Sequence, residues 1–294
     1  MMGWGELFAL ASALVWALAV ILFRRSGETL PAFELNLFKN FFGLVLLVPT
    51  ILLVDGLKLP DFTATELLLV FVSGLIGIAV ADTWYLKALN MMGASRTGIV
   101  SSLFSPFVIL LSAVFLGERL VPWQWLGFLL VMSGVLLVTW RTRRSAVDAA
   151  DVKKGVLYGV GAVFMMAAGV VMVKEILETR SFLWTVELRV VGGVGGMLVY
   201  ILVSRQWQNV KRNFSQPQPW GTVMFASFLG AYFALLLWLA GYKLIDASVA
   251  SILNETNVSF IVFLAWLMLG EQITRRKLVG LGLTLGGVII MMLV

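Results

Sequence analysis

Long apolar stretches recur along the whole chain, and they constrain its fold more than any other feature. Each runs for about 18–25 residues, enough for a helix to cross roughly 30 Å of hydrocarbon. Runs such as 41–54 and 126–138 lack the apolar and polar alternation of barrel strands. Because lipid cannot satisfy unpaired backbone groups, spans of this kind must be helices. The sequence therefore predicts an all-α integral membrane protein.

Charged residues and Pro or Gly divide the apolar runs into ten transmembrane helices. In the first half we expect spans at 5–23, 33–54, 65–86, 95–116 and 123–140. In the second half we expect spans at 155–173, 183–203, 221–242, 247–269 and 277–294. Residues 141–154 between them form a linker that is too charged to enter the membrane. The predicted units are therefore 1–140, the linker 141–154, and 155–294.

The composition excludes several kinds of chemistry. Hydrophobic residues make up 60% of the 294 residues and charged residues 13%, against about 45–50% and roughly 25% in soluble proteins. The chain has neither cysteine nor histidine, which excludes disulfides, thiolate nucleophiles and imidazole proton relays. No glycine-rich phosphate loop follows a strand. We expect no metal, no cofactor and no enzymatic activity, and any proton chemistry must use carboxylates.

The two halves repeat each other at a constant offset. Leu116-Gly117-Glu118 recurs as Leu269-Gly270-Glu271, and the same offset relates Gly127 to Gly280 and Gly134 to Gly287. Such glycines open a helix face to close packing. Five spans in each copy force the second copy to enter the membrane from the opposite side. The pattern therefore predicts two inverted five-helix repeats, which are typical of secondary transporters.

The repeated motifs carry a family resemblance. They are Ala94-Ser95, Pro106-Phe107 and Leu116-Gly117-Glu118-Arg119 in the first half, and Ala247-Ser248 and Leu269-Gly270-Glu271-Gln272 in the second. In these motifs and in its ten spans, the chain resembles the EamA family of the drug/metabolite transporter superfamily. The resemblance implies a substrate cavity between two EamA-like repeats, alternating access, and export of metabolites, amino acids or drugs.

Two positions depart from the family pattern. The offset partner of Pro106 is Ser259, and an unusually polar segment, 254–257, precedes it. An arginine that the family often carries in the second span is represented by Arg189 in the seventh, whereas its offset partner is Asn36. Both departures indicate a site specialised beyond the general pattern.

Glu255 is the strongest candidate for a coupling residue. It lies near the middle of the ninth span, where an ionisable side chain costs at least about 2.5–3.5 kcal/mol and is functional by default. A carboxylate held there could take up or release a proton. The alternative is a structural carboxylate neutralised by Arg189 or Lys39.

Polar neighbours of Glu255 extend this candidate site. Asn254 and Asn257 supply amide groups, and the helix is expected to be irregular there. In the fourth span, Ser101 and Ser102 are the offset partners of Asn254 and Glu255, and Ser105 precedes Pro106, which disfavours helical geometry. We expect these serines to approach Glu255. The alternative role of the two asparagines is structural hydrogen bonding between helices.

Asp82, Trp84 and Tyr85 form a second candidate group late in the third span. A carboxylate beside two aromatic faces could hold an ammonium group. Aromatic residues also gather at membrane interfaces without any binding role, so both interpretations stay open.

Lys39, Glu187 and Arg189 are the remaining intramembrane charges. Residues two apart on a helix point in different directions, so Glu187 and Arg189 should find partners on other helices. These partners could be structural ion pairs or the substrate.

These features favour a secondary transporter of a small metabolite, coupled to protons through Glu255. The carboxylates and aromatic residues favour a cationic or zwitterionic amine or amino acid as the solute. Lys39 and Arg189 leave an anionic solute as an alternative. Export is the expected direction. The alternatives are a flippase for a lipid-linked intermediate and a membrane scaffold or enzyme. The expected partners are the solute, protons and membrane lipids, a homodimer is left open, and the net charge of +6 is not read as nucleic-acid binding.

The distribution of Lys and Arg predicts the orientation in the cytoplasmic (inner) membrane. Without Lys39 and Arg189, which lie within spans, 20 of the 22 basic residues remain. Odd-numbered loops hold 15 of these and even-numbered loops hold 5. Basic loops stay in the cytoplasm, so the count places linker 141–154 inside and both termini outside. The family resemblance instead implies cytoplasmic termini.

Overall fold

The computed structural model describes residues 3–56, 60–139, 149–269 and 275–292. Within these ranges every regular element is a helix, which confirms the all-α prediction. Six segments are long and apolar enough to cross a membrane: Trp4–Ser26, Ala32–Val54, Ala64–Met91, Lys153–Thr179, Phe182–Val203 and Trp220–Leu244. Shorter apolar helices cover Phe104–Phe115, Pro122–Leu137 and Leu278–Ile290. The chain is therefore built as a multi-pass membrane protein.

The helices of the first half are α1 (Trp4–Ser26), α2 (Ala32–Val54), α3 (Ala64–Gly74), α4 (Ala81–Ser101), α5 (Phe104–Phe115) and α6 (Pro122–Thr139). Those of the second half are α7 (Ala149–Thr179), α8 (Phe182–Val203), α9 (Trp207–Ser215), α10 (Trp220–Ser227), α11 (Leu235–Leu244), α12 (Ala247–Asn254), α13 (Thr256–Leu269) and α14 (Arg275–Met292). Local chemistry sets several of these ends. At the start of α3, for example, Thr63 and Glu66 form a reciprocal capping box.

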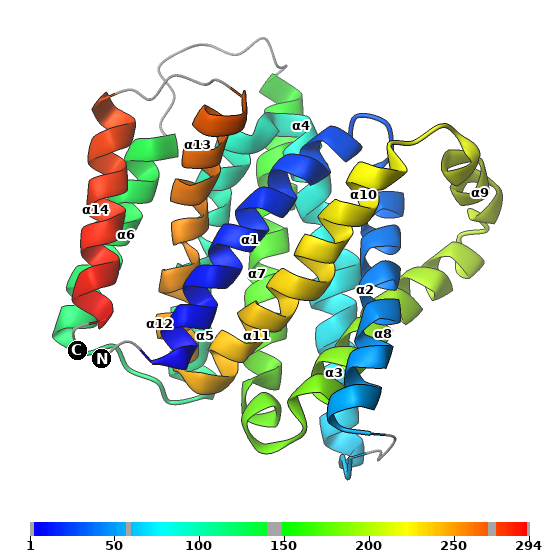
Figure 1. The fold of residues 1–294 in the computed structure, drawn as a ribbon, viewed down its shortest axis with the longest axis horizontal. Coiled ribbons are helices and arrows are strands. Elements are labelled where there is room, and N and C mark those ends of the chain that lie inside the picture. The colour runs from blue at the N-terminus through cyan, green and yellow to red at the C-terminus, as the bar shows by residue number, and fades with distance from the viewer. Residues whose placement is uncertain (1–2, 57–59, 140–148, 270–274, 293–294) are drawn as a thin grey trace.

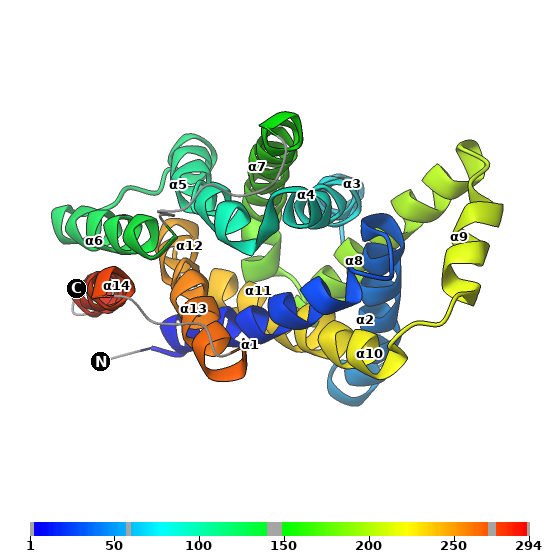
Figure 2. The ribbon, with the colours of Figure 1, turned by 90° about the horizontal axis from the view of Figure 1, so that it is seen from above.

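Two rows of helices face each other when the molecule is seen from above (Figure 2). One row contains α5, α7, α4 and α3, and the other contains α13, α1, α10 and α2. The pair α6 and α14 closes one end, and α9 lies at the opposite end (Figures 1 and 2). Both rows contain helices from both halves of the sequence, so the space between the rows is walled by the two halves together.

Two π-helical segments interrupt corresponding helices of the two halves. Segment η1 (Leu75–Val80) joins α3 to α4, and η2 (Phe228–Ala234) joins α10 to α11. Their first residues are related by the offset that relates Leu116 to Leu269. A π-helical turn changes the backbone hydrogen-bond pattern and often marks a functional site. The carbonyl of Ile78 in η1 is bound by the side chain of Asn36, with 2.8 Å between Nδ2 and the oxygen.

A second pair of interruptions lies in the predicted fourth and ninth spans. Helix α4 ends at Ser101 and α5 begins at Phe104, while α12 ends at Asn254 and α13 begins at Thr256. In the first half, Pro106 cannot donate to the carbonyl four residues earlier, and it is tolerated here because it lies in the first turn of α5. The predicted irregularity around Glu255 is confirmed, because Glu255 is the residue between α12 and α13.

Three boundaries differ from the sequence prediction. Helix α4 continues through 87–94, where a loop was predicted, because that segment contains no proline to stop it. Helix α9 occupies part of the predicted loop 204–220; Val210 is buried and Phe214 stacks on Trp220 with ring centroids 6.2 Å apart. Helix α7 begins at Ala149, inside the predicted linker 141–154, whose residues before 149 lie outside the described ranges.

Glycines bring α6 and α14 into close contact. A Cβ atom at Gly134 would lie 2.5 Å from the carbonyl oxygen of Gly280, and one at Gly287 would lie 2.7 Å from that of Gly127. The predicted packing role of these offset-related glycines is confirmed. Gly282 and Gly286 differ, because a Cβ at either position meets nothing within 4 Å.

Candidate functional site

A cavity of about 160 Å³ lies between the two rows of helices. Four charged side chains and several amides and hydroxyls line it together with aromatic rings. The lining includes Ser12, Trp16, Lys39, Asn40, Asp82, Tyr85, Ser101, Phe104, Arg189, Trp238, Asn254, Glu255 and Asn257. A concave site that combines apolar walls with a few convergent polar groups is typical of a small-molecule site.

Glu255 lies at the break between α12 and α13 and is 3% exposed. Its Oε1 atom accepts a hydrogen bond from the hydroxyl of Ser105 at 3.0 Å and from the Ser105 backbone nitrogen at 3.3 Å. The predicted approach of the fourth and ninth spans is confirmed at this contact. None of the three ion pairs recorded among the described residues includes Glu255. The geometry therefore gives no support to neutralisation by Arg189 or Lys39.

The two asparagines beside Glu255 differ in their surroundings. Asn254 Nδ2 donates to the carbonyl of Ala250 at 2.8 Å, and its Oδ1 atom lies 2.9 Å from the hydroxyl of Ser12 in α1. Asn257 lines the cavity, and the described part of the chain offers its side chain no recorded hydrogen bond. Asn254 therefore stabilises the broken helix, whereas Asn257 lies in the cavity lining without a recorded protein partner among the described residues.

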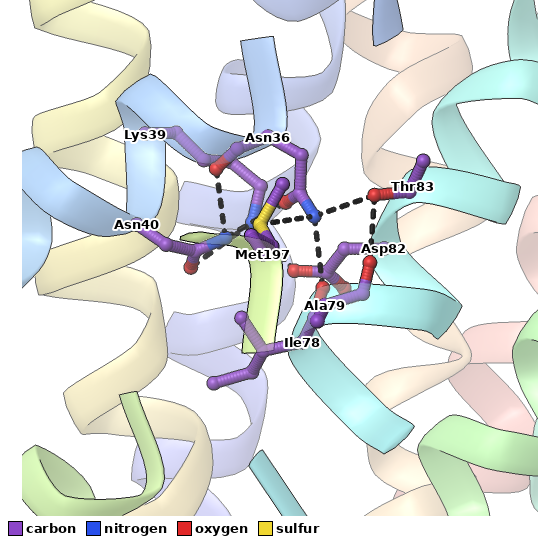
Figure 3. A network of polar contacts seen from close by, with 8 residues as sticks. All are labelled: Asn36, Lys39, Asn40, Ile78, Ala79, Asp82, Thr83 and Met197. Carbon is purple, nitrogen blue, oxygen red and sulfur yellow. Dashed lines mark hydrogen bonds and ion pairs between the residues drawn. The ribbon is translucent and has the colours of Figure 1, made fainter. Parts of the chain in front are cut away.

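Lys39 of α2 and Asp82 of α4 line the cavity and form an ion pair, with 2.5 Å between Nζ and Oδ2. Figure 3 shows that a polar network surrounds the pair. Lys39 also donates to Asn40 at 3.3 Å, and Asn40 donates to the side-chain oxygen of Asn36 at 2.7 Å. Asn36 in turn donates to Thr83 at 3.0 Å. The charges of Lys39 and Asp82 cancel, so Asp82 is already occupied by a protein cation.

Trp84 and Tyr85 point in different directions from α4. Tyr85 lines the cavity beside Trp16, with ring centroids 6.3 Å apart. Trp84 lies edge-on to Tyr158 of α7 at 5.5 Å, and a Cβ at Gly161 would meet its ring at 2.7 Å. Consecutive residues on a helix do not share a face. Trp84 is therefore not among the cavity-lining residues, and the predicted pair of aromatic faces is not formed.

Arg189 reaches the cavity from α8 and is 2% exposed. Its Nε atom donates to the hydroxyl of Ser73 at 2.9 Å, and its guanidinium carbon lies 5.5 Å from the centre of the Trp238 ring. Glycines make room for it, since a Cβ at Gly77 would lie 2.8 Å from Nη2. The predicted partner on another helix is therefore a serine and a ring, and no carboxylate of the described residues pairs with Arg189.

The remaining predicted residues divide between the cavity and the core. Ser101 lines the cavity. Ser102 and Ser105 are buried but are not among its lining residues. Glu187 is also buried away from the cavity, and its Oε2 atom has no hydrogen-bond partner in the described part of the chain.

Sequence reasoning missed two hydroxyls that support the site. Ser12 contacts Asn254, and Ser73 positions Arg189. Each is a serine inside an apolar span, which is a weak signal because such serines often bond only to their own helix backbone. The contacts reach across 242 and 116 residues of sequence, and no local pattern encodes them.

Glu118 lies just after the end of α5, and it contacts a helix of the other half. Its carboxylate accepts hydrogen bonds from the backbone nitrogens of Ala247 at 2.8 Å and Ser248 at 2.9 Å. A negative charge is favoured at the N-terminus of a helix such as α12. Burial raises the pKa of neighbouring Asp246, and Glu118 adds to this rise. Glu271, the offset partner of Glu118, lies outside the described residues.

Comparison with known proteins gives the family. The profile of the EamA-like transporter family matches residues 3–140 and again residues 153–293. Another protein's crystal structure superposes with a TM-score of 0.76 over 97% of this chain and 95% of its own, at 17% identity. That likeness shows the fold alone.

Two curated relatives from Rattus norvegicus match part of the chain. Solute carrier family 35 member F6 is 29% identical over 119 residues, which are 40% of this chain and 32% of that protein. The UDP-N-acetylglucosamine transporter is 28% identical over 123 residues, which are 39% of this chain and 38% of that protein. The matched part spans about a third of each relative. Because the family profile covers nearly the whole chain, this protein belongs to the EamA-like transporter family.

Proposed function

We propose that this protein is a secondary active transporter that moves a small metabolite across the membrane by alternating access. Its ten spans form two inverted repeats, 1–140 and 155–294, joined by linker 141–154. The offset-related π-helices and the offset-related breaks support this arrangement. Inverted repeats bring their discontinuous helices together around a shared substrate site, and rocking of one repeat against the other opens that site to each side in turn.

One observation carries the proposal. A buried carboxylate, Glu255, sits at a helix break in the wall of a cavity of about 160 Å³. Its recorded partner is Ser105 from the opposite half, so a movement between the halves would change its surroundings. An ionisable group inside a membrane span is costly to keep unless it has a function.

The placement of Glu255 supports proton coupling. The chain has no histidine, so a carboxylate must carry any transported proton. Asp82 is held by Lys39, which leaves Glu255 as the carboxylate of the described cavity lining without a cationic partner. Ser105 and Asn257 provide hydrogen-bonding groups near it, and Asn257 is free to contact the solute.

The size and charge of the cavity favour a small solute. A nucleotide sugar, the solute named for one relative, carries a diphosphate. Among the described cavity residues, Arg189 is the one cation without an ion pair, so a diphosphate would be poorly compensated. Asp82, Trp84 and Tyr85 were the reason to expect an amine or amino acid as the solute. Asp82 is paired with Lys39 and Trp84 lies outside the cavity lining, so these residues give less support to a cationic solute.

Counterflow in proteoliposomes tests transport itself. Solutes that raise the thermal stability of the purified protein are selected first, because a ligand of the folded state raises apparent stability. Liposomes loaded with unlabelled solute should then take up the labelled form transiently, and protein-free liposomes should not. Translocation of a lipid analogue without solute counterflow would instead favour a flippase, and absence of both would reject transport.

We further propose that linker 141–154 faces the cytoplasm and that both termini face outward. The excess of basic residues in the odd-numbered loops supports this orientation. The chain has no cysteine, so a single Ser145→Cys variant can report the side. Protection of this cysteine from an impermeant maleimide in intact cells, with labelling after permeabilisation, is the expected result. Labelling in intact cells would contradict the orientation.

A further inference from the structure

Arg189 is a cation whose protein contacts leave part of it unused. Its Nε atom is bound by Ser73 and its face lies against Trp238. The structure records no hydrogen bond from either Nη atom to the described residues. A guanidinium carries five N–H donors in a planar fork that matches a carboxylate. Arg189 is one of the residues that line the cavity, and none of the ion pairs among the described residues includes it.

No other charged side chain of the described cavity lining forms an ion pair with Arg189. Lys39 and Asp82 are bound to each other at 2.5 Å. Glu255 is bound to Ser105, and no ion pair joins it to Arg189 among the described residues. A buried charge without a counter-charge is costly. With Glu255 protonated, the described lining therefore carries one positive charge that an anionic solute would neutralise.

Glycines on neighbouring helices allow the backbone and side chain of Arg189 to pack closely against them. A Cβ at Gly74 would lie 1.9 Å from the carbonyl oxygen of Arg189, and Cβ atoms at Gly77 and Gly169 would lie 2.8 and 3.6 Å from its Nη2 atom. Three small positions on α3, η1 and α7 thus admit the helix and its guanidinium. Ser73 accepts the hydrogen bond from the Nε atom, which leaves the two Nη atoms without a recorded hydrogen bond to the described residues.

We propose that Arg189 binds the carboxylate group of the transported solute, so that the site selects small monocarboxylates. The proposal rests on the transport function above and names the solute class. One unpaired guanidinium matches a single negative charge, whereas a phosphate monoester would bring close to two. The aromatic rings of Trp16, Phe104 and Trp238 line the same cavity and suit an apolar body on the acid.

Matched probes test the charge preference without knowledge of the natural solute. Benzoate, benzamide, benzylamine and phenyl phosphate share one ring and differ in the attached group. We expect benzoate at saturating concentration to raise the apparent Tm of the detergent-purified protein by about 2–4 °C and the other three to raise it less. A larger effect of benzamide, benzylamine or phenyl phosphate, or no effect of benzoate, would overturn the proposal.

Variants assign the preference to Arg189. Arg189→Gln should abolish the benzoate shift, Arg189→Lys should keep a reduced one, and Arg24→Gln, at an exposed arginine, should keep it in full. A benzoate shift that survives in Arg189→Gln would also overturn the proposal. If Arg189→Gln does not fold, the four probes on the unaltered protein and on Arg189→Lys still test whether Arg189 binds a carboxylate. Binding in detergent needs no proton coupling, so a benzoate shift without counterflow would reject the transport function alone.

Discussion

The charged side chains that line the cavity fall into two groups. Lys39 of α2 and Asp82 of α4 are paired, and Asn36 and Asn40 continue the network (Figure 3). Arg189 of α8 and Glu255 at the α12–α13 break have hydrogen bonds to serines but no ion pair among the described residues. The paired charges compensate each other. The unpaired charges remain available, at a cost in stability that a function must justify.

The largest stability effect should come from breaking the ion pair of Lys39 and Asp82. Asp82→Asn leaves Lys39 buried without its counter-charge and should lower the free energy of unfolding by about 3–5 kcal/mol. Adding Lys39→Met should recover much of this loss because no charge is then left alone. Equilibrium unfolding in detergent measures all three proteins.

The half-buried pair of Arg180 and Glu66 provides the control. Its nitrogen and oxygen lie 2.8 Å apart near the helix ends, where such a pair contributes about 0–1 kcal/mol. Glu66 raises the pKa of Arg180, so Arg180 keeps its charge at every accessible pH. A Glu66→Gln variant as damaging as Asp82→Asn would remove the distinction between the two pairs.

A medium effect should come from the glycine that admits Arg189. Gly74→Ala places a Cβ against the Arg189 carbonyl and should destabilise the protein by about 1–3 kcal/mol. Gly282→Ala is the matched control, because a Cβ there meets nothing within 4 Å, and it should be neutral or stabilising by up to about 1 kcal/mol. Equal stability of the two variants in thermal unfolding would show that α3 and α8 do not approach closely at Gly74.

The smallest effect should come from Ser105→Ala. This change removes the hydroxyl that donates to Glu255 at 3.0 Å but keeps the backbone donor, so the loss should be about 1 kcal/mol. Ser133→Ala, at an exposed position on α6, should change stability by less than about 0.5 kcal/mol. Identical unfolding curves for the two variants would contradict the contact between the α5 start and the α12–α13 break.

The sequence was informative where local pattern decides structure. Apolar run length predicted the six long apolar helices of the described ranges, and the offset predicted the glycines that pack α6 on α14. The polar segment around Glu255 predicted the broken helix. The partner of each charged side chain was harder to predict. Lys39 and Asp82, for example, lie 43 positions apart, and nothing in a single sequence indicates that they pair. Trp84 and Tyr85 were taken as one unit because they are adjacent, although a helix turns them to different faces. Helix α9 was missed because its apolar positions are few and its charge suggested a loop.

The most direct test of proton coupling separates driven transport from exchange in one variant. Glu255→Gln replaces the carboxyl with an amide of similar shape that cannot carry a transported proton. In proteoliposomes with a pH gradient, it should lose solute accumulation entirely while it keeps counterflow, which needs no driving force. Glu28→Gln, at an exposed carboxylate, should keep both activities. Accumulation by Glu255→Gln at a rate close to that of the unaltered protein would contradict the assignment of coupling to Glu255.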